Sequence, residues 1–87
     1  MGRTIPMVAF HLYLAKQSFD SFVAGRRYEY RWSTYQYRDG ETILTFHDRE
    51  SGHELNWFWF DNEPDSLLVE RFEFPGVPPA PGPGVPA

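Results

Sequence analysis

Cysteine is absent from this chain, which excludes disulfide bonds and thiolate zinc sites as sources of stability. No apolar run approaches the roughly twenty residues that a membrane-spanning helix needs. Glycine-rich phosphate loops and the G-x-S-x-G nucleophile motif are also missing. We therefore expect a cytoplasmic protein that is not an enzyme, uses no cofactor or metal, has no membrane partner and is stabilised by hydrophobic packing alone.

Positive charge is scarce, because the formal net charge is -4. This argues against a duplex-DNA binder, which needs a cationic surface to neutralise phosphates. The charge is also unevenly distributed: residues 1–38 carry six basic and two acidic side chains, whereas residues 39–87 carry ten acidic and two basic ones. The second half of the chain is therefore expected to attract a partner with a basic surface.

Aromatic side chains are plentiful, with eight Phe, five Tyr and three Trp among 87 residues. Each ring can bury about 150–250 Å², which suits a short chain that must build a core from few residues. The thirteen residues from 75 to 87 include six Pro and three Gly, and such a segment cannot supply the amide donors that helices and strands need. We predict one domain over residues 1–74 and a disordered Pro/Gly-rich tail over residues 75–87.

Alternation of aromatic and polar residues predicts an antiparallel meander. It begins with a strand over residues 28–37, followed by Asp39-Gly40, a strong signal for a two-residue hairpin turn. Further strands are expected over residues 41–47, 53–60 and 67–74. The segment 8–24 fits either a strand or a helical stripe, and our preferred interpretation is a strand over 8–14 and a short helical turn over 18–24.

The pattern of Gly25 and Tyr28 before a meander with an Asp-Gly turn resembles the opening of many small SH3-like barrels. The resemblance covers residues 22–60 and implies a fold only. The predicted fold class is mainly β: a small antiparallel meander curled into an SH3-like or similar small barrel, with one short N-terminal helix or turn.

The predicted turns also assign side chains to faces, because side chains alternate along a strand. With Asp39-Gly40 as the turn, Arg38 lies opposite Glu41 and Tyr35 lies opposite Leu44. One face then carries Tyr35, Tyr37, Leu44, Phe46, Phe58 and Phe60, and the other carries Tyr30, Trp32, Ile43, His47, Leu55, Trp57 and Trp59. Since both faces are aromatic, we expect part of the second to stay exposed.

This exposed face predicts a small protein-binding module, in the manner of a stoichiometric inhibitor or an immunity-type protein. Trp and Tyr are enriched at binding hot spots. The predicted anchors are Tyr30, Trp32, Trp57 and Trp59, and the predicted steering charges are Asp61, Glu63 and Asp65. A homodimer formed through the same face is an alternative.

A second alternative is a module that binds single-stranded nucleic acid, since cations interleaved with aromatic rings can follow phosphates while bases stack. The candidate residues are Arg27, Arg31, Tyr35 and Tyr37. His47 and His53 would be neighbours across the loop 48–52, but a zinc site needs a further ligand, and alternation places Glu54 on the opposite face. We therefore interpret both histidines as ordinary hairpin residues.

Overall fold

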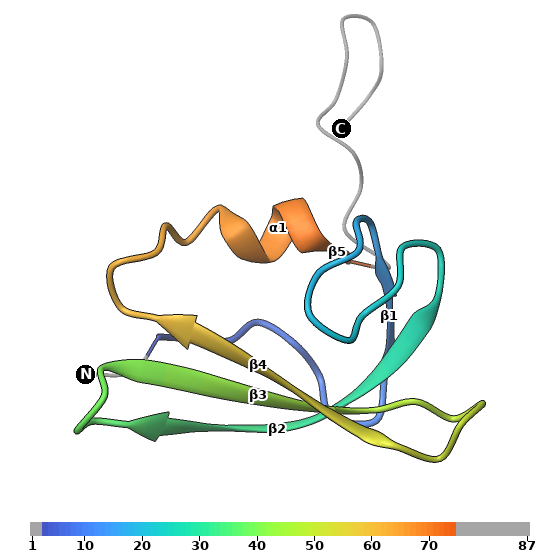
Figure 1. Cartoon of the computed structure of the whole chain (residues 1–87), viewed down its shortest axis with the longest axis horizontal. Helices are drawn as coiled ribbons and strands as arrows, with labels where there is room; N and C mark the ends of the chain where they lie inside the picture. The colour runs from blue at the N-terminus through green and yellow to red at the C-terminus, as the bar shows by residue number, and fades with distance from the viewer. Residues whose placement is uncertain (1–2, 75–87) are drawn as a thin grey trace, which may run out of the picture.

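The computed structural model describes residues 3–74, which form one antiparallel sheet and one short helix (Figure 1). The elements in chain order are β1 (Leu12–Ala15), β2 (Arg27–Gln36), β3 (Glu41–His47), β4 (Glu54–Phe60), α1 (Leu67–Arg71) and β5 (Phe72–Glu73). The strands are ordered β4-β3-β2-β1-β5 in the sheet. The prediction of a mainly β, antiparallel fold is confirmed, while the tail predicted over residues 75–87 lies outside the described residues.

The sheet is open, since β4 and β5 form its two edges and do not pair with each other within residues 3–74. The predicted closure into an SH3-like barrel is therefore not confirmed. β1 and β5 are short, so the sheet consists mainly of β2, β3 and β4.

The turn between β2 and β3 is longer than predicted. Gln36 pairs with Glu41 and Tyr35 pairs with Thr42, so residues 37–40 form the connection and Gly40 adopts a φ of 61°. The predicted pairs of Arg38 with Glu41 and of Tyr35 with Leu44 are wrong. Because the register moves by two positions, Tyr35 nevertheless stays on the same face as Leu44.

A β-bulge then changes the faces of β2. Tyr30 pairs with Phe46 whereas Trp32 pairs with Thr45, so Arg31 is an extra residue without a partner of its own on β3. A bulge of this kind reverses the alternation of side chains on either side of it. Tyr30 therefore points to the face of Phe46, while Trp32 points to the opposite face, and the prediction that the two rings share a face is wrong.

The loop between β3 and β4 is one residue longer than predicted. His47 pairs with Glu54, so the loop spans residues 48–53, and its Gly52 has a φ of 78°. A shift of one residue exchanges the two faces of a strand. Trp57 and Trp59 consequently join Leu44 on one face, and Phe58 lies on the other, which is the reverse of the predicted arrangement.

The segments outside the meander also differ from the prediction. Residues 18–24 form no helix: Phe19 and Phe22 make an isolated antiparallel bridge, and Asp20 has a φ of 49°. The strand predicted over residues 67–74 is instead α1 followed by the two-residue strand β5. Leu68 and Phe72 are one helical turn apart, although together with Phe74 they also fit the alternating spacing of a strand.

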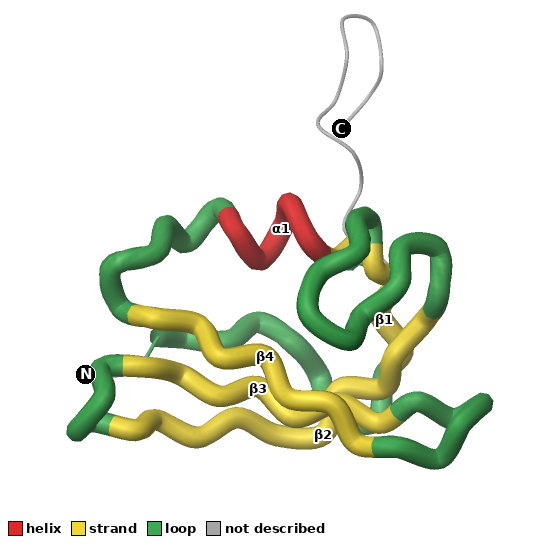
Figure 2. The backbone as a smooth tube through the Cα atoms, in the orientation of Figure 1, coloured by secondary structure: helices red, strands yellow, loops and turns green. Residues whose placement is uncertain are grey.

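The core lies on one face of the three long strands, which we call the inner face. Its buried rings include Trp57 and Trp59, stacked at 4.8 Å between centroids, and Phe46 against Phe72 at 4.9 Å. Figure 2 shows α1 and a long loop before β2 on the same side of these strands.

Among residues 3–74, no helix has the length and apolarity needed to cross a bilayer.

Candidate protein-binding face

The predicted anchors do not share one surface. Tyr30, Trp57 and Trp59 are 6%, 1% and 2% exposed and belong to the core, whereas Trp32 is 50% exposed. The expectation of an exposed ring cluster is wrong for these three core residues. The cause is the register of β4 together with the bulge at Arg31, which turn the rings toward α1 and the N-terminal segment.

The opposite face of the meander, which we call the outer face, carries a different set of apolar side chains. Phe58 and Phe60 are 46% and 44% exposed on β4. Ile43 is half-buried and pairs directly with Phe58. We define the outer patch as Trp32, Ile43, Phe58 and Phe60.

Two carboxylates on the outer face border the outer patch. Glu41 pairs with Phe60, and Glu54 lies four residues before Phe58 on the same strand. Neither carboxylate forms an ion pair with any of the described residues, although Glu41 is only 9% exposed. The outer face therefore combines exposed aromatic rings with two carboxylates, Glu54 exposed and Glu41 largely buried, that form no ion pair within residues 3–74.

The edge of β4 is open over part of its length. The amide of Asp48 donates to the carbonyl of His53, and the amide of Asp61 donates to the carbonyl of Gly40, at 2.8 Å each. His53 and Asp61 are the odd-numbered residues on either side of β4, so the odd-numbered residues within β4 also direct their backbone polar groups toward β3. Because these groups alternate along a strand, Glu54, Asn56 and Phe58 direct theirs away from β3, where no other strand of the described chain pairs with them.

One end of this edge is capped by the chain itself. The amide of Phe60 donates to Glu63 Oε1 at 2.9 Å. The carbonyl of Phe60 accepts from Arg3 Nη2 at 2.6 Å and from the amide of Glu63 at 3.0 Å. The open stretch therefore ends before Phe60.

The predicted steering charges each have a partner within the chain. Asp61 accepts a hydrogen bond of 2.6 Å from the Tyr35 hydroxyl, which raises the pKa of Tyr35 above its ordinary value. Glu63 caps Phe60 as described, and Asp65 forms an ion pair with Arg3. These carboxylates hold the loop after β4 in place, and any steering role comes in addition to that.

At the other end of the meander, Glu29 is a buried carboxylate held by two arginines. Arg49 Nη2 donates to Glu29 Oε2 at 2.6 Å, and Arg31 Nη1 lies 3.3 Å from Oε1. The hydrogen bond from Arg49 lowers the pKa of Glu29 below its ordinary value, and the charges of both arginines add to this effect against the opposing effect of burial. The cluster fixes the bulged part of β2 against the loop 48–53.

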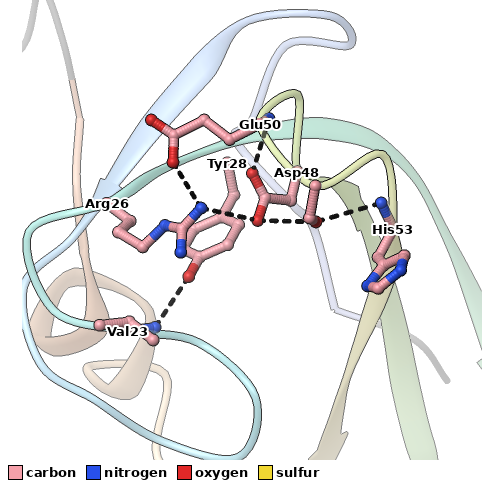
Figure 3. Close-up of polar contacts among 7 residues, drawn as sticks. Val23, Arg26, Tyr28, Asp48, Glu50 and His53 are labelled. Atoms are coloured by element: carbon pink, nitrogen blue, oxygen red, sulfur yellow. Dashed lines mark hydrogen bonds and ion pairs between the residues drawn. The ribbon is translucent and has the colours of Figure 1, made fainter.

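Asp48 organises that loop, as Figure 3 shows. Its carboxylate accepts hydrogen bonds from the Glu50 amide at 3.0 Å and from the Ser51 hydroxyl at 3.0 Å. Arg26 bridges Asp48 and Glu50. Burial raises the pKa of Asp48, but the hydrogen bonds and Arg26 outweigh it, so the pKa is lowered overall. The arrangement is that of a turn held together by its own side chains and by Arg26.

The four residues of the nucleic-acid alternative are dispersed. Arg27 is exposed where β2 pairs with β1, while Arg31 is engaged with Glu29 and lies 4.9 Å from the Phe10 ring. Tyr35 is bonded to Asp61, and Tyr37 is 84% exposed in the turn after β2. They form no continuous track of cations and rings.

No group of three or more His, Asp or Glu side chains suited to a metal ion occurs within residues 3–74. His47 lies opposite Glu54 rather than His53, so the predicted histidine pair across the loop is wrong.

Comparisons with protein-family models, with curated proteins and with solved structures found no match to this chain.

Sequence reasoning assigned Phe58 and Phe60 to the wrong face, and a signal for the correct one was available. In β4 the residues on the Phe58 face also include Glu54 and Asn56, which are typical of a solvated surface. The alternate positions Leu55, Trp57 and Trp59 are entirely apolar, as a core face requires. Polarity within β4 thus indicates the faces better than an assumed loop length does.

Proposed function

We propose that this protein is a non-catalytic binding module that attaches to another protein through the outer patch. The observation that carries this proposal is the exposure of Trp32, Phe58 and Phe60 on the one sheet face that α1 and the N-terminal segment leave uncovered. Exposed apolar patches rimmed by polar residues mark interaction sites in folded proteins. Trp is also among the residue types that dominate binding energy at interfaces.

The charge around the outer patch supports a basic partner. Glu41 and Glu54 are unpaired within the described residues, and the net charge of the chain is -4. Complementary charge speeds association and selects the partner. A stoichiometric inhibitor of a basic protein is the narrower form of this proposal.

Alanine substitution tests the outer patch directly. A partner would be isolated by affinity capture with the full chain and its affinity measured by calorimetry. We expect Trp32→Ala and Phe58→Ala to weaken binding by roughly tenfold or more, since hot-spot truncations cost at least about 1–2 kcal/mol. Unchanged affinity in both variants would contradict the proposal.

Val69→Ala is the matched control, because Val69 is also exposed but lies on α1. It should leave the affinity unchanged.

A salt titration with single-stranded oligonucleotides tests the alternative function, because phosphate contacts make affinity fall steeply with ionic strength. Tight, salt-sensitive oligonucleotide binding that is lost in an Arg27→Ala variant would favour the nucleic-acid module instead.

A further inference from the structure

We propose that the partner binds as an extended strand added antiparallel to the open edge of β4, with basic residues at both ends of the added strand. This proposal rests on the proposed function and specifies how the outer patch is used. The backbone groups of Glu54, Asn56 and Phe58 point away from β3. They offer alternating donors and acceptors of the kind that an added strand can use.

The open edge and the outer patch are continuous. Phe58 contributes its outward backbone groups to the edge and its half-exposed ring to the outer face. In an antiparallel pair, directly opposed residues share a face. The residue opposite Phe58 in the added strand would therefore pack against the Phe58 ring while its backbone bonds to that of Phe58.

The chain restricts where the strand can lie. The backbone groups of Phe60 are occupied by Glu63 and Arg3, so pairing beyond Phe58 is blocked at that end. Toward the other end, β4 begins at Glu54. The usable edge thus comprises the outward groups of Glu54, Asn56 and Phe58, which fits a short strand rather than a long sheet extension.

Charge distinguishes a basic partner from a second copy of this chain. Glu54 is exposed on the outer face at one end of the usable edge, and the loop that contains Asp61, Glu63 and Asp65 follows β4 at the other end. An antiparallel second copy would bring each Glu54 toward the other copy's loop that contains Asp61, Glu63 and Asp65. Like charges in close opposition are unfavourable, whereas a lysine in the place of that Glu54 would face the same acidic loop, and a lysine at the other end of the partner strand would lie opposite Glu54.

The probe is the peptide Lys-Thr-Val-Thr-Val-Thr-Lys with both ends blocked, measured by fluorescence anisotropy on the full chain. Its valines and lysines share one face. In the proposed register the valines lie opposite Phe58 and Asn56 and the second lysine lies opposite Glu54, all with their amides directed toward β4, while the first lysine extends past Phe58 without pairing. N-methylation of the two valines should weaken binding about tenfold or more, because each methyl group removes a donor. N-methylation of two threonines, whose amides point away, should change affinity by less than about threefold.

Three results would overturn strand addition. They are equal affinity of both methylated peptides, failure of the unmodified peptide to bind at millimolar concentration, and equal affinity of a peptide in which Glu replaces both Lys. A free protein that is dimeric by light scattering, and whose dimer is lost on Asn56→Pro but not on Asn56→Ala, would instead make a second copy the occupant of the edge.

The same peptides separate this proposal from the proposed function. If Phe58→Ala abolishes peptide binding while both methylated peptides bind like the parent, the outer patch is the site and strand addition is wrong. If binding depends on valine methylation but not on Phe58→Ala or Trp32→Ala, the edge is used and the outer patch is not.

Discussion

Glu29 shows how much a single residue depends on its partners in this small domain. Its carboxylate is 6% exposed, and burying a charge is costly unless it is paired and hydrogen-bonded. Arg49 and Arg31 provide that pairing across the bulge in β2. The cluster therefore ties the stability of the bulge, which orients both Tyr30 and Trp32, to the ionised state of one side chain.

We expect stability to fall at acidic pH as Glu29 takes up a proton. Its pKa in the folded protein is lower than the ordinary value of 4.5, which applies to the unfolded chain. The stabilisation from ionised Glu29 is therefore fully present above the unfolded-state pKa and is lost as pH falls through the lower folded-state pKa. Urea unfolding of the wild type and of Glu29→Gln should differ most near neutral pH, with the difference shrinking below pH 4.5. Arg49→Gln should show the same trend, and a pH-independent difference would contradict it.

Trp57 and Phe58 test the register of β4, because neighbouring residues on a strand point to opposite faces. Trp57 is 1% exposed and stacks on Trp59, so Trp57→Ala should cost about 3–5 kcal/mol in the free energy of unfolding. Phe58→Ala should cost about 1 kcal/mol, since half of that ring is in water. Denaturant titrations give both values, and the reverse order would support the register expected from the sequence.

At the scale of elements, the sequence predicts strands well and their connections poorly. Alternation locates β2, β3 and β4, because each is rich in β-branched and aromatic residues. The sequence predicts too few residues for the turn at Asp39-Gly40 and for the loop before Glu54, since turn-forming residues mark a turn without fixing its length. One such error, combined with the unrecognised extra residue Arg31, was enough to exchange the core and surface rings of the candidate site.

The elements outside the meander were harder to predict for a different reason. The segment from Leu67 to Glu73 contains both helical and alternating apolar spacings, and tertiary contacts decide between them. Leu68 and Phe72 are buried against the sheet one helical turn apart, which a continuous strand would also place on one face. The Phe72 ring packs on Phe46 and Trp57, and no local sequence pattern reveals these contacts.

For the whole molecule, Arg3 joins the start of the chain to the segment that follows β4. Its guanidinium lies 4.0 Å from the centroid of the Trp59 ring, and it donates to Phe60, Glu63 and Asp65. The side chain of Arg3 is only 11% exposed, whereas that of Asp65 is 91% exposed, so solvent screens the ion pair and the stacking on Trp59 and the bonds to the loop backbone carry most of the stabilisation. The N-terminal segment thus closes the core and caps one end of the β4 edge at the same time.

We expect Arg3→Ala to destabilise the whole domain by about 1–3 kcal/mol, since hydrogen bonds to a charged group and a stacked cation are lost together. The melting temperature should fall by roughly 4–8 °C for each kcal/mol in a domain of this size. Arg3→Lys should recover part of the loss, because lysine keeps the charge without the planar fork of donors. The control is Arg27→Ala, which removes an exposed arginine that has no ion pair within residues 3–74. An equal loss of stability in both variants would mean that Arg3 acts through net charge and not through its contacts with Trp59 and the loop.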